Sequence, residues 1–456
     1  METASCVGET LVEEIRQQGF QKVKVAVTDI DGILRGKMMH LDKFATALEK
    51  GFGFCNVVFG WDSADVCYEN SSYTGWHSGY PDALVALDPG TYRLLPWEQR
   101  LPFFLGDFLE ADQRTPLPIC PRAVLKRVVQ KAESMGYSPW VGCEYEWFNF
   151  QETPQIMEAK GFQQPVPLTP GMFGYSLLRA GRYREYFNDL MDSLESFRVP
   201  LEGLHTETGP GVYEAAIQCA PAVEAADRAV LFKTAVKEIA ATHGVIPSFM
   251  ARWNERLPGC SGHIHQSLRD ERGRNVFYQE GTSDLSPVFR SYMAGLVHCV
   301  PELLVMMAPT VNSYKRLVPG FWAPTRSTWG VDNRTCAYRA IVGSPQSTRV
   351  EVRVPGADMN PYLAIAAALA AGLYGIENEL SLDQSPVTGN GYACELARPF
   401  ASTLLESATL FQQSTLAHAL LGENFVQHFA ATRLWEWQQA QQVVTDWEMR
   451  RYFEII

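Results

Sequence analysis

The 456-residue sequence has no excess of positive charge and no long hydrophobic segment. It contains 39 Lys and Arg residues against 51 Asp and Glu residues, a net charge of −12. Because nucleic acids and anionic membranes attract basic surfaces, we expect neither as a partner. The longest apolar run identified, Leu363 to Ile376, is shorter than the ~18 residues of a membrane span. The acidic, amphipathic N-terminus does not resemble a signal peptide, so we expect a cytoplasmic protein.

Three familiar sequence signatures are also missing. The ten cysteines form no CxxC pair and no zinc-type spacing, so we interpret them as reduced and mostly buried thiols. Neither a P-loop nor the glycine motif of a Rossmann fold is present, which disfavours both kinds of nucleotide site. With 46% hydrophobic and 20% charged residues, the composition is nevertheless that of a globular protein with a large core.

A proline-rich segment at 112–121, DQRTPLPICP, predicts a linker. We therefore predict two domains, comprising residues 1–112 and 113–456. In the first, the residue pattern predicts an initial helix, two strands within 22–40 around the Asp31-Gly32 turn, a helix at 41–50, a long loop at 51–81, and strands at 83–95 and 102–109. In the second, helices are predicted from Pro121 to Gly136, at 220–243, at 361–379 and through 400–455, with strand-like blocks between them.

Two carboxylates stand at alternate positions of one predicted strand. Glu144 and Glu146 lie in VGCEYEWF, among residues with high strand propensity. Residues i and i+2 of a strand point to the same face, so these two side chains are expected side by side. Like charges this close repel one another unless a cation lies between them. The alternative is an ordinary solvated strand face.

Further polar groups repeat this spacing. Glu207 and Glu214 flank a Gly/Pro turn, His263 and His265 share one strand face, and Glu351 stands between Arg349 and Arg353. Carboxylates combined with one or two histidines suit Mg²⁺ or Mn²⁺ better than a soft metal. Taken alone, the two histidines could equally be surface residues or satisfied core residues.

Arginines form a second set, together with Lys315, in an otherwise acidic chain. They lie among Gly, Pro and aromatic residues, at Arg316, Arg334, Arg339, Arg349 and Arg353. The guanidinium fork matches carboxylate and phosphate groups with two hydrogen bonds. Hard cations beside arginines are the groups that phosphoryl transfer requires. The residues alone therefore predict a divalent-metal enzyme that handles a phosphate and a carboxylate without a P-loop.

Six blocks in this order resemble the glutamine synthetase superfamily: CEYEWF, HTETGPGVYE, GCSGHIHQS, NSYKRLVPGFWAP, NRTCAYR and RVEVRVPGADMNPYLAIAAALAAGLYGIE. Within it, the chain resembles the γ-glutamylpolyamine and γ-glutamylmonoamine synthetases. The resemblance implies an α+β fold: a small N-terminal β-grasp domain, then a catalytic domain with an antiparallel sheet, forming a partial barrel, and surrounding helices. It also implies a homo-hexameric ring, or a dodecamer of two stacked rings, with active sites between subunits.

The resemblance also implies roles for single residues. Two or three Mg²⁺ or Mn²⁺ ions would be held by Glu146, Glu207 and Glu214 near glutamate, and by Glu144, His263 and Glu351 near the phosphates of the co-substrate ATP. Arg316, Arg353 and Gly259 would bind glutamate, Arg334 and Arg339 the phosphates, and His265 and Ser267 the nucleotide. Arg316, Arg334 and Arg353 would take part in catalysis. Asp62, or else Asp65, would reach the active site of a neighbouring subunit.

Two departures from the family pattern bear on the substrate. Trp322 stands where ammonia-using members carry a glutamate, and Pro258 replaces an Asn beside Gly259. An indole cannot bind ammonium as a carboxylate does, but it offers an apolar and cation–π surface to a larger amine. We therefore expect an ATP-dependent ligase that joins the γ-carboxylate of L-glutamate to an organic amine. The alternatives are a glutamine synthetase that uses ammonia and a catalytically inactive structural or binding homologue.

Overall fold

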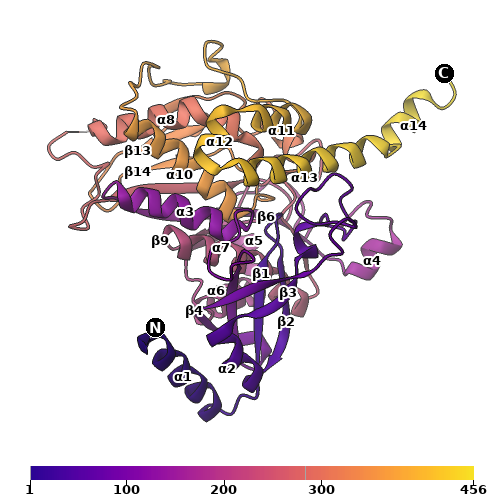
Figure 1. Cartoon of the computed structure of the whole chain (residues 1–456). Coiled ribbons are helices and arrows are strands. Elements are labelled where there is room, and N and C mark those ends of the chain that lie inside the picture. Colours follow the sequence, from indigo (N-terminus) through magenta and orange to yellow (C-terminus); the bar gives the residue numbers. More distant parts are fainter. Residues whose placement is uncertain (1, 283) are drawn as a thin grey trace.

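The computed structural model describes residues 2–282 and 284–456, with side chains from Thr10 onward. Two β-sheets are present: a five-stranded sheet from the N-terminal part of the chain and a nine-stranded sheet from the rest. Figure 1 shows the N-terminal strands at one end and the larger sheet within a body of helices. This arrangement confirms the predicted α+β fold. The two sheets fall on either side of residue 113, and the domain boundary there stays a prediction.

The N-terminal sheet has the strand order β2-β1-β5-β4-β3, with β1 and β5 parallel and the other neighbours antiparallel. Its elements are α1 (Glu2–Gln17), β1 (Lys22–Thr28), β2 (Leu34–His40), α2 (Leu41–Lys50), β3 (Phe52–Cys55), η1 (Asn56–Phe59), β4 (Asp82–Leu95), η2 (Pro96–Glu98) and β5 (Leu101–Phe108). The predicted helices and strands are confirmed. The segment 51–81 is not a single loop, because its first residues form β3 and η1.

Alternation along these strands gives the sheet two buried faces. Val23, Val25 and Val27 pack with α2 in one hydrophobic core, whereas Ala26 between them belongs to the core of the larger body. This is the period of two expected of a strand. Both faces of the sheet are therefore covered, one by its own helix and the other by the catalytic body.

The larger sheet has the order β12-β13-β14-β11-β6-β8-β7, with β9 and β10 also paired to β6. Its strands are β6 (Ser138–Phe150), β7 (Leu201–Thr206), β8 (Val212–Ile217), β9 (Ala220–Pro221), β10 (Ile246–Ser248), β11 (Gly262–Arg269), β12 (Trp329–Val331), β13 (Tyr338–Ile341) and β14 (Arg349–Val352). The predicted antiparallel arrangement holds except between β12 and β13, which are parallel.

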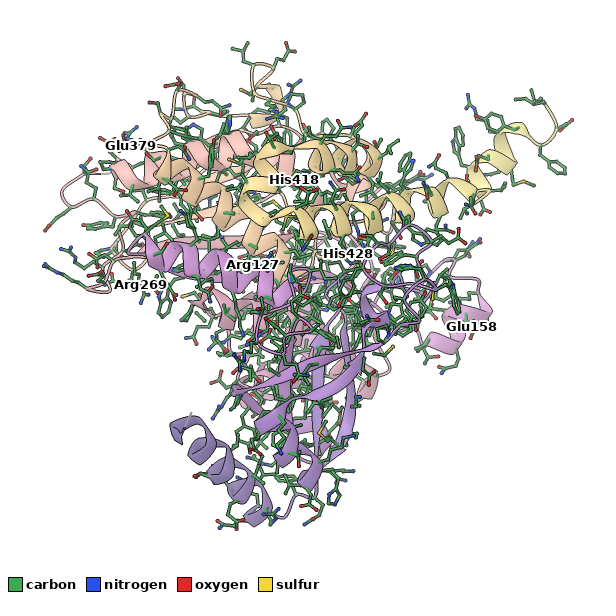
Figure 2. The ribbon with its side chains drawn as sticks, viewed as in Figure 1. Arg127, Glu158, Arg269, Glu379, His418 and His428 are labelled. Carbon is green, nitrogen blue, oxygen red and sulfur yellow. The ribbon has the colours of Figure 1, made fainter. Side chains whose placement is uncertain are left out.

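Helices surround this sheet. They are α3 (Pro121–Ser134), α4 (Pro154–Ala159), α5 (Leu177–Arg182), α6 (Arg184–Ser196), α7 (Ala222–Thr242), α8 (Pro287–Leu303), η3 (Leu304–Met306), α9 (Ser313–Arg316), α10 (Pro361–Glu377), η4 (Gly391–Ala393), α11 (Leu404–Gln413), α12 (Thr415–Leu421), α13 (Glu423–Gln442) and α14 (Asp446–Tyr452). The helix α10 is almost entirely buried, as its Ala- and Leu-rich sequence requires. By contrast, α14 extends away from the body (Figures 1 and 2).

One helical stretch is longer and more apolar than any segment identified from the sequence. Residues Pro287–Met306, which form α8 and η3, are long and apolar enough to cross a membrane by length and composition. However, 67% of that stretch is buried inside the protein, as is usual for a core helix.

The nine cysteines whose side chains are described are all free, and five of them are buried. Cys6 lies outside the described side chains.

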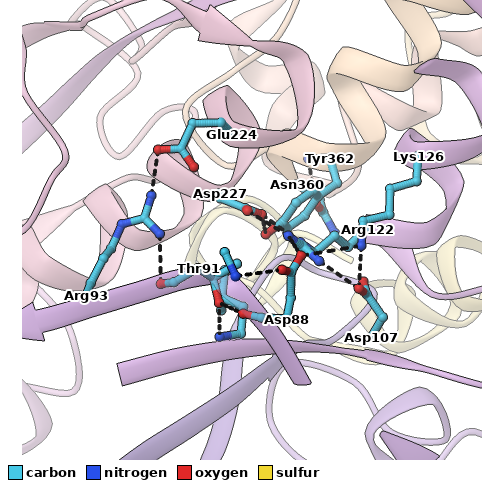
Figure 3. Close-up of polar contacts among 12 residues, drawn as sticks. Asp88, Thr91, Arg93, Asp107, Arg122, Lys126, Glu224, Asp227, Asn360 and Tyr362 are labelled. Atoms are coloured by element: carbon cyan, nitrogen blue, oxygen red, sulfur yellow. Dashed lines mark hydrogen bonds and ion pairs between the residues drawn. The ribbon is translucent and has the colours of Figure 1, made fainter. Parts of the chain in front are cut away.

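Arg122 connects the N-terminal sheet to the helices of the body (Figure 3). Its guanidinium donates to Asp107 at 2.7 Å, to Asp88 at 2.8 Å and, through two nitrogens, to Asp227 at 2.8 and 2.9 Å. The Tyr362 hydroxyl also donates to Asp227, at 2.6 Å. These groups come from β4, β5, α3, α7 and α10. The side chain of Arg122 is only 4% exposed, so its positive charge depends on these carboxylates.

We predict that Arg122→Ala lowers the free energy of unfolding by about 3–5 kcal/mol, because three carboxylates lose their shared partner inside the protein. Urea unfolding followed by fluorescence measures this change. Arg256→Ala is the matched control, since the Arg256 side chain is 88% exposed; it should change stability by less than about 0.5 kcal/mol. Equal effects of the two substitutions would contradict the structural role of Arg122.

Candidate active site

A cavity of about 520 Å³ opens on one face of the larger sheet. Carboxylates and imidazoles form one wall of this catalytic cavity, and arginines form another. Most of the site residues that the sequence predicts line it: Glu144, Glu146, Glu207, Glu214, Gly259, His263, His265, Arg316, Trp322, Arg334, Arg339, Glu351 and Arg353. The fold thus gathers residues that lie as far apart in the sequence as Glu144 and Arg353.

Strand register explains how the acidic wall forms. Glu144 on β6 lies opposite His263 on β11, and Glu146 lies opposite Glu214 on β8. His265 in turn lies opposite Glu351 on β14. Directly opposed residues of neighbouring strands share one face. Because every second side chain of each strand faces the cavity, neighbouring strands together form a two-dimensional array of polar groups.

The first group in this array centres on Glu144. His263 Nδ1 lies 3.2 Å from Glu144 Oε1 and 3.3 Å from Glu351 Oε1. His265 Nε2 lies 3.7 Å from Glu144 Oε2. Donor atoms of Glu144, His265 and Glu351 all lie within 4.8 Å of one another, a spacing that a metal ion can bridge. His265, predicted at the nucleotide edge, thus also stands beside the acidic group, and either imidazole could complete it.

The second group contains a histidine that the sequence reasoning missed. Donor atoms of His205, Glu207 and Glu214 lie within 4.8 Å of one another. His205 Nε2 is 3.6 Å from Glu214 Oε2, and its ring stacks on Tyr175 at 4.6 Å. The signal was the same alternation used elsewhere, because His205 in β7 stands two residues before Glu207, which directly follows that strand. Glu146 stands next to this group and accepts a hydrogen bond from the Ser261 amide at 2.7 Å.

The carboxylates perturb one another strongly. Burial, together with the negative charges of Glu144 and Glu146, raises the pKa of Glu214 to about 11. Burial and the charge of Glu146 raise the pKa of Glu207. Glu351 behaves oppositely: burial opposes its ionisation, but the charges of His263 and Arg353 lower its pKa to about 2. One half of the array therefore has compensated charge, and the other half lacks positive charge.

The donor set fits hard divalent cations. Among the described residues, Glu207 Oε2, His205 Nε2 and His263 Nε2 are buried and have no hydrogen-bond partner. Buried polar atoms are normally paired, so three unpaired atoms in one cavity indicate that it is built to bind a ligand. Carboxylate oxygens with imidazole nitrogens suit Mg²⁺ or Mn²⁺. Such a cation would also remove the repulsion that raises the pKa of Glu214.

The arginine wall differs from one residue to the next. Arg339 and Arg353 both form ion pairs with Glu351. Arg334 makes no hydrogen bond or ion pair with any residue that the structure describes. Arg316 is 2% exposed, yet its guanidinium donates only to the carbonyl oxygens of Val354 and Arg353, at 2.8 and 3.2 Å. Two guanidinium groups thus remain available to anions in the catalytic cavity.

Gly259 allows the chain to pass close to Arg316. A Cβ atom at this position would lie 2.2 Å from the Ala251 carbonyl oxygen and 2.9 Å from Arg316 Cγ. Neither distance is tolerated by a real side chain, so only glycine fits without moving the backbone. Pro258 precedes it and also lines the catalytic cavity.

Comparison with known proteins identifies the family. Residues 118–452 match the glutamine synthetase catalytic domain. The chain belongs to the glutamine synthetase family. A type-1 glutamine synthetase 2 of Dictyostelium discoideum is 49% identical over 451 residues, 98% of this chain and 86% of the relative. A glutamate–isopropylamine ligase of a Pseudomonas species is 37% identical over 446 residues and 97% of each chain.

Further matches agree with this assignment. A γ-glutamylethanolamide synthetase of Streptomyces coelicolor is 37% identical over 433 residues, 95% of this chain and 92% of the relative. The solved GmaS/ADP complex matches with a TM-score of 0.84 and 27% identity, over 97% of this chain and 99% of that one. The protein is thus an enzyme of the ligase class, and its fold is that of glutamine synthetase-like structures.

The mouth of the cavity is aromatic in this family member. Trp322 is 57% exposed, lines the cavity and has a φ of +63°, a conformation that few residues other than glycine adopt. Phe321 lies under the Arg252 guanidinium, 4.2 Å from ring centre to Cζ. Tyr175, which the sequence reasoning did not select, forms the other side beside His205. Aromatic rings thus line the same cavity as the charged walls.

Two predicted site residues lie elsewhere. Ser267 does not line the catalytic cavity, and neither does Asp62. The Asp62 carboxylate accepts hydrogen bonds from the Ala64 and Val66 amides at 2.8 and 3.0 Å and from Trp435 Nε1 at 3.2 Å. Asp65 pairs with Arg35 at 2.8 Å. Their predicted roles concern a neighbouring subunit and stay predictions.

We predict that Mn²⁺ stabilises the protein through these carboxylates. At about 100 times its dissociation constant, one bound ion should add roughly 2.7 kcal/mol to the stability. Glu214→Gln keeps the shape but removes a metal-donor oxygen. Because the raised pKa keeps Glu214 protonated in the metal-free protein, that protein should keep its melting temperature while the Mn²⁺ effect decreases. Differential scanning calorimetry measures both. The control Glu379→Gln, exposed just after α10 (Figure 2), should retain the full Mn²⁺ effect; an unchanged effect in Glu214→Gln would refute the site.

Proposed function

We propose that the protein is an ATP-dependent ligase that joins the γ-carboxylate of L-glutamate to an organic amine. The observation that carries this proposal is the position of Trp322 at the mouth of a cavity that keeps its acidic and arginine walls. The walls supply what phosphoryl transfer to a carboxylate needs. The indole alters only the place where the nitrogen nucleophile would enter.

Two or three Mg²⁺ or Mn²⁺ ions fit the acidic wall. Glu146, Glu207 and Glu214, joined by His205, would hold the metal on one side, and Glu144, Glu351 and His263 or His265 the metal on the other. When bound, these ions neutralise the negative charge of the transferred phosphoryl group. Arg334, which has no partner among the described residues, and Arg339 are placed to bind phosphate oxygens. We propose Ser267 and His265 as the contacts to the nucleotide.

Glutamate is the acid substrate that best fits the arginine wall. A buried guanidinium without a carboxylate partner is costly, and burial lowers the pKa of Arg316. A substrate carboxylate beside Arg316 would compensate this charge, and Arg353 lies close by. Gly259 keeps the space above Arg316 open. These residues would orient glutamate so that its γ-carboxylate faces the phosphate-binding arginines.

The reaction then has two steps. The γ-carboxylate oxygen attacks the terminal phosphorus of ATP, the bond to ADP breaks, and γ-glutamyl phosphate forms. The neutral amine next attacks the acyl carbon, phosphate leaves with the C–O bond electrons, and the amine nitrogen loses a proton. Arg334 and Arg353 stabilise the charge that develops on the phosphoryl and acyl oxygens.

Trp322 favours an alkyl- or arylamine over ammonia. Its face offers cation–π attraction and apolar contact to a substituted ammonium group, and no carboxylate stands in its place to hold ammonium. The similarity to ligases named for isopropylamine and ethanolamine supports this reading. The aromatic mouth suggests a bulky or apolar monoamine over a polyamine.

Two alternative functions are possible, and a specific observation bears on each of them. Glutamine synthesis from ammonia is favoured by the similarity to the Dictyostelium type-1 glutamine synthetase 2. An inactive scaffold is disfavoured, because it has no physical need for unpaired carboxylate and imidazole atoms in one cavity. We further propose a cytoplasmic homo-oligomer, a hexameric ring or two stacked rings, in which Asp62 approaches a neighbour's site.

We predict that ATP hydrolysis coupled to glutamate is faster with organic amines than with ammonia. A coupled assay of ADP release should be run with ammonium, ethylamine, isopropylamine, aniline and putrescine. The highest kcat/KM is expected for an apolar monoamine. Turnover with ammonium equal to or better than with every amine would overturn the proposed specificity, and no ADP release with any nucleophile would favour the inactive scaffold.

We predict that Trp322→Glu shifts the preference toward ammonia by about tenfold or more, since the new carboxylate adds a charge-assisted contact of roughly 1.5–3 kcal/mol to ammonium. The ratio of kcat/KM for ammonium and for the best amine measures this shift. Trp322→Phe is the control, because it keeps an aromatic face and should keep amine preference. If the ratio is unchanged in Trp322→Glu, the indole does not line the amine site.

A further inference from the structure

Arg252 contacts the aromatic mouth without itself lining the catalytic cavity. It lies in the loop between β10 and β11, and its guanidinium Cζ is 4.2 Å from the ring centre of Phe321. Phe321 and its neighbour Trp322 both line the catalytic cavity. One face of the guanidinium is therefore in direct contact with the segment that forms the mouth.

The edge of the Arg252 guanidinium is occupied by backbone carbonyl oxygens. Nε donates to the carbonyl oxygens of Asn254 and Leu257 at 3.2 and 3.1 Å. Nη2 donates to that of Glu255 at 2.6 Å, and Nη1 donates to that of Lys315 at 2.8 Å. Each of the three nitrogens has a partner, so the plane of the group is fixed. Its flat faces remain for other contacts.

The backbone of Arg252 is fixed as well. Its amide donates to Asn312 Oδ1 at 2.8 Å, and its carbonyl oxygen accepts from Asn312 Nδ2 at 2.7 Å. Asn312 immediately precedes α9, the helix that ends at Arg316. Arg252 is thus tied to the start of this helix through Asn312 and to its last turn through Lys315. The guanidinium therefore keeps a constant position relative to Arg316.

The segment that Arg252 contacts contains a strained residue. Gly320 has a φ of +82° and Trp322 a φ of +63°, so the chain is left-handed on both sides of Phe321. This conformation is unfavourable for a residue with a Cβ atom and persists only where surrounding contacts enforce it. Trp322 is largely exposed, so much of this enforcement has to come from its neighbours. The contact between Phe321 and Arg252 is such a constraint.

Charge favours the same contact. Arg252 makes no ion pair with any residue that the structure describes, and burial lowers its pKa. A guanidinium in this state gains from the electron-rich face of an aromatic ring. One face of Phe321 is thus occupied by a fixed cation, which leaves the exposed Trp322 indole open to a substituted ammonium group.

We propose that Arg252 is a positioning residue for the nitrogen nucleophile: its guanidinium face holds Phe321 and thereby fixes the Trp322 indole at the mouth of the catalytic cavity. Arg252 touches no reacting atom and acts through the two aromatic residues. This role rests on the proposed function, because it assumes that the nucleophile enters past Trp322. It applies to ammonia as well as to an organic amine.

Steady-state kinetics of Arg252→Met, Phe321→Leu and the double variant test this role in the coupled ADP-release assay. Loss of one cation–π contact should raise the KM of the best nucleophile about threefold or more in Arg252→Met, while kcat and the KM of glutamate change by less than about twofold. Phe321→Leu keeps the carbonyl contacts of Arg252 and should have the same effect. In the double variant the two effects should not add, because both substitutions remove one shared contact.

Arg256→Met is the matched control, since Arg256 belongs to the same loop and its side chain is 88% exposed. It should leave every KM unchanged. Equal increases in the KM of glutamate and of the nucleophile in Arg252→Met would mean that Arg252 only supports its loop. Additive effects in the double variant would mean that Arg252 does not act through Phe321. Either result overturns the proposal.

A crystal structure of Arg252→Met tests the same role without turnover. Phe321 and Trp322 should move, while Gly259 and Arg316 keep their positions; an unmoved indole would overturn the proposal. If Arg252→Met does not fold, Arg252→Lys takes its place in both experiments, because lysine lacks the flat guanidinium face. An inactive wild-type protein would refute the proposed function, whereas the crystallographic result would still decide whether Arg252 positions the indole.

Discussion

Repulsion between carboxylates is the constraint on which the rest of the structure depends. The strands β6, β8 and β14 hold Glu144, Glu146, Glu214 and Glu351 on one face of a sheet, and Glu207 joins them directly after β7. Hydrogen-bonded backbone fixes their positions, so the side chains cannot separate to relieve the repulsion. The cost appears as raised pKa values at Glu207 and Glu214 and as orphaned polar atoms. Holding the carboxylates together lowers the stability of the folded protein, and the same arrangement preorganises the cavity to receive cations.

The scaffold must be rigid enough to maintain this arrangement. Behind the sheet, α3, α7, α8 and α10 pack as a continuous hydrophobic core, and the Arg122 network ties them to the N-terminal sheet. The networks around Arg122 and Glu351 follow the same rule: a buried charge is surrounded by several partners. Arg316 breaks this rule, since its guanidinium donates only to backbone carbonyl oxygens. It faces the catalytic cavity, so this unpaired cation marks where an anionic ligand is expected.

Much of this could be predicted from the sequence because the period of two is visible in it. The alternation in VGCEYEWF, HIH and RVEVR placed Glu144, Glu146, His263, His265 and Glu351 on common faces, and the proline-rich segment near 113 separated the two sheets. His205 was not predicted as a site residue, although it alternates with Glu207. The prediction for this segment considered only the carboxylates that flank the Gly/Pro turn. The position of Tyr175 in the catalytic cavity depends on contacts between distant segments. No local pattern reports such contacts.

The central claim is that one face of the sheet gathers divalent cations beside an aromatic entrance. Anomalous diffraction from crystals grown with Mn²⁺ and ADP tests it most directly. The account predicts peaks in the catalytic cavity, one beside Glu144, Glu351 and His263 or His265 and one beside Glu207, Glu214 and His205, with Trp322 at the mouth. Peaks confined to the outer surface at saturating Mn²⁺, or an indole packed away from that cavity, would contradict it.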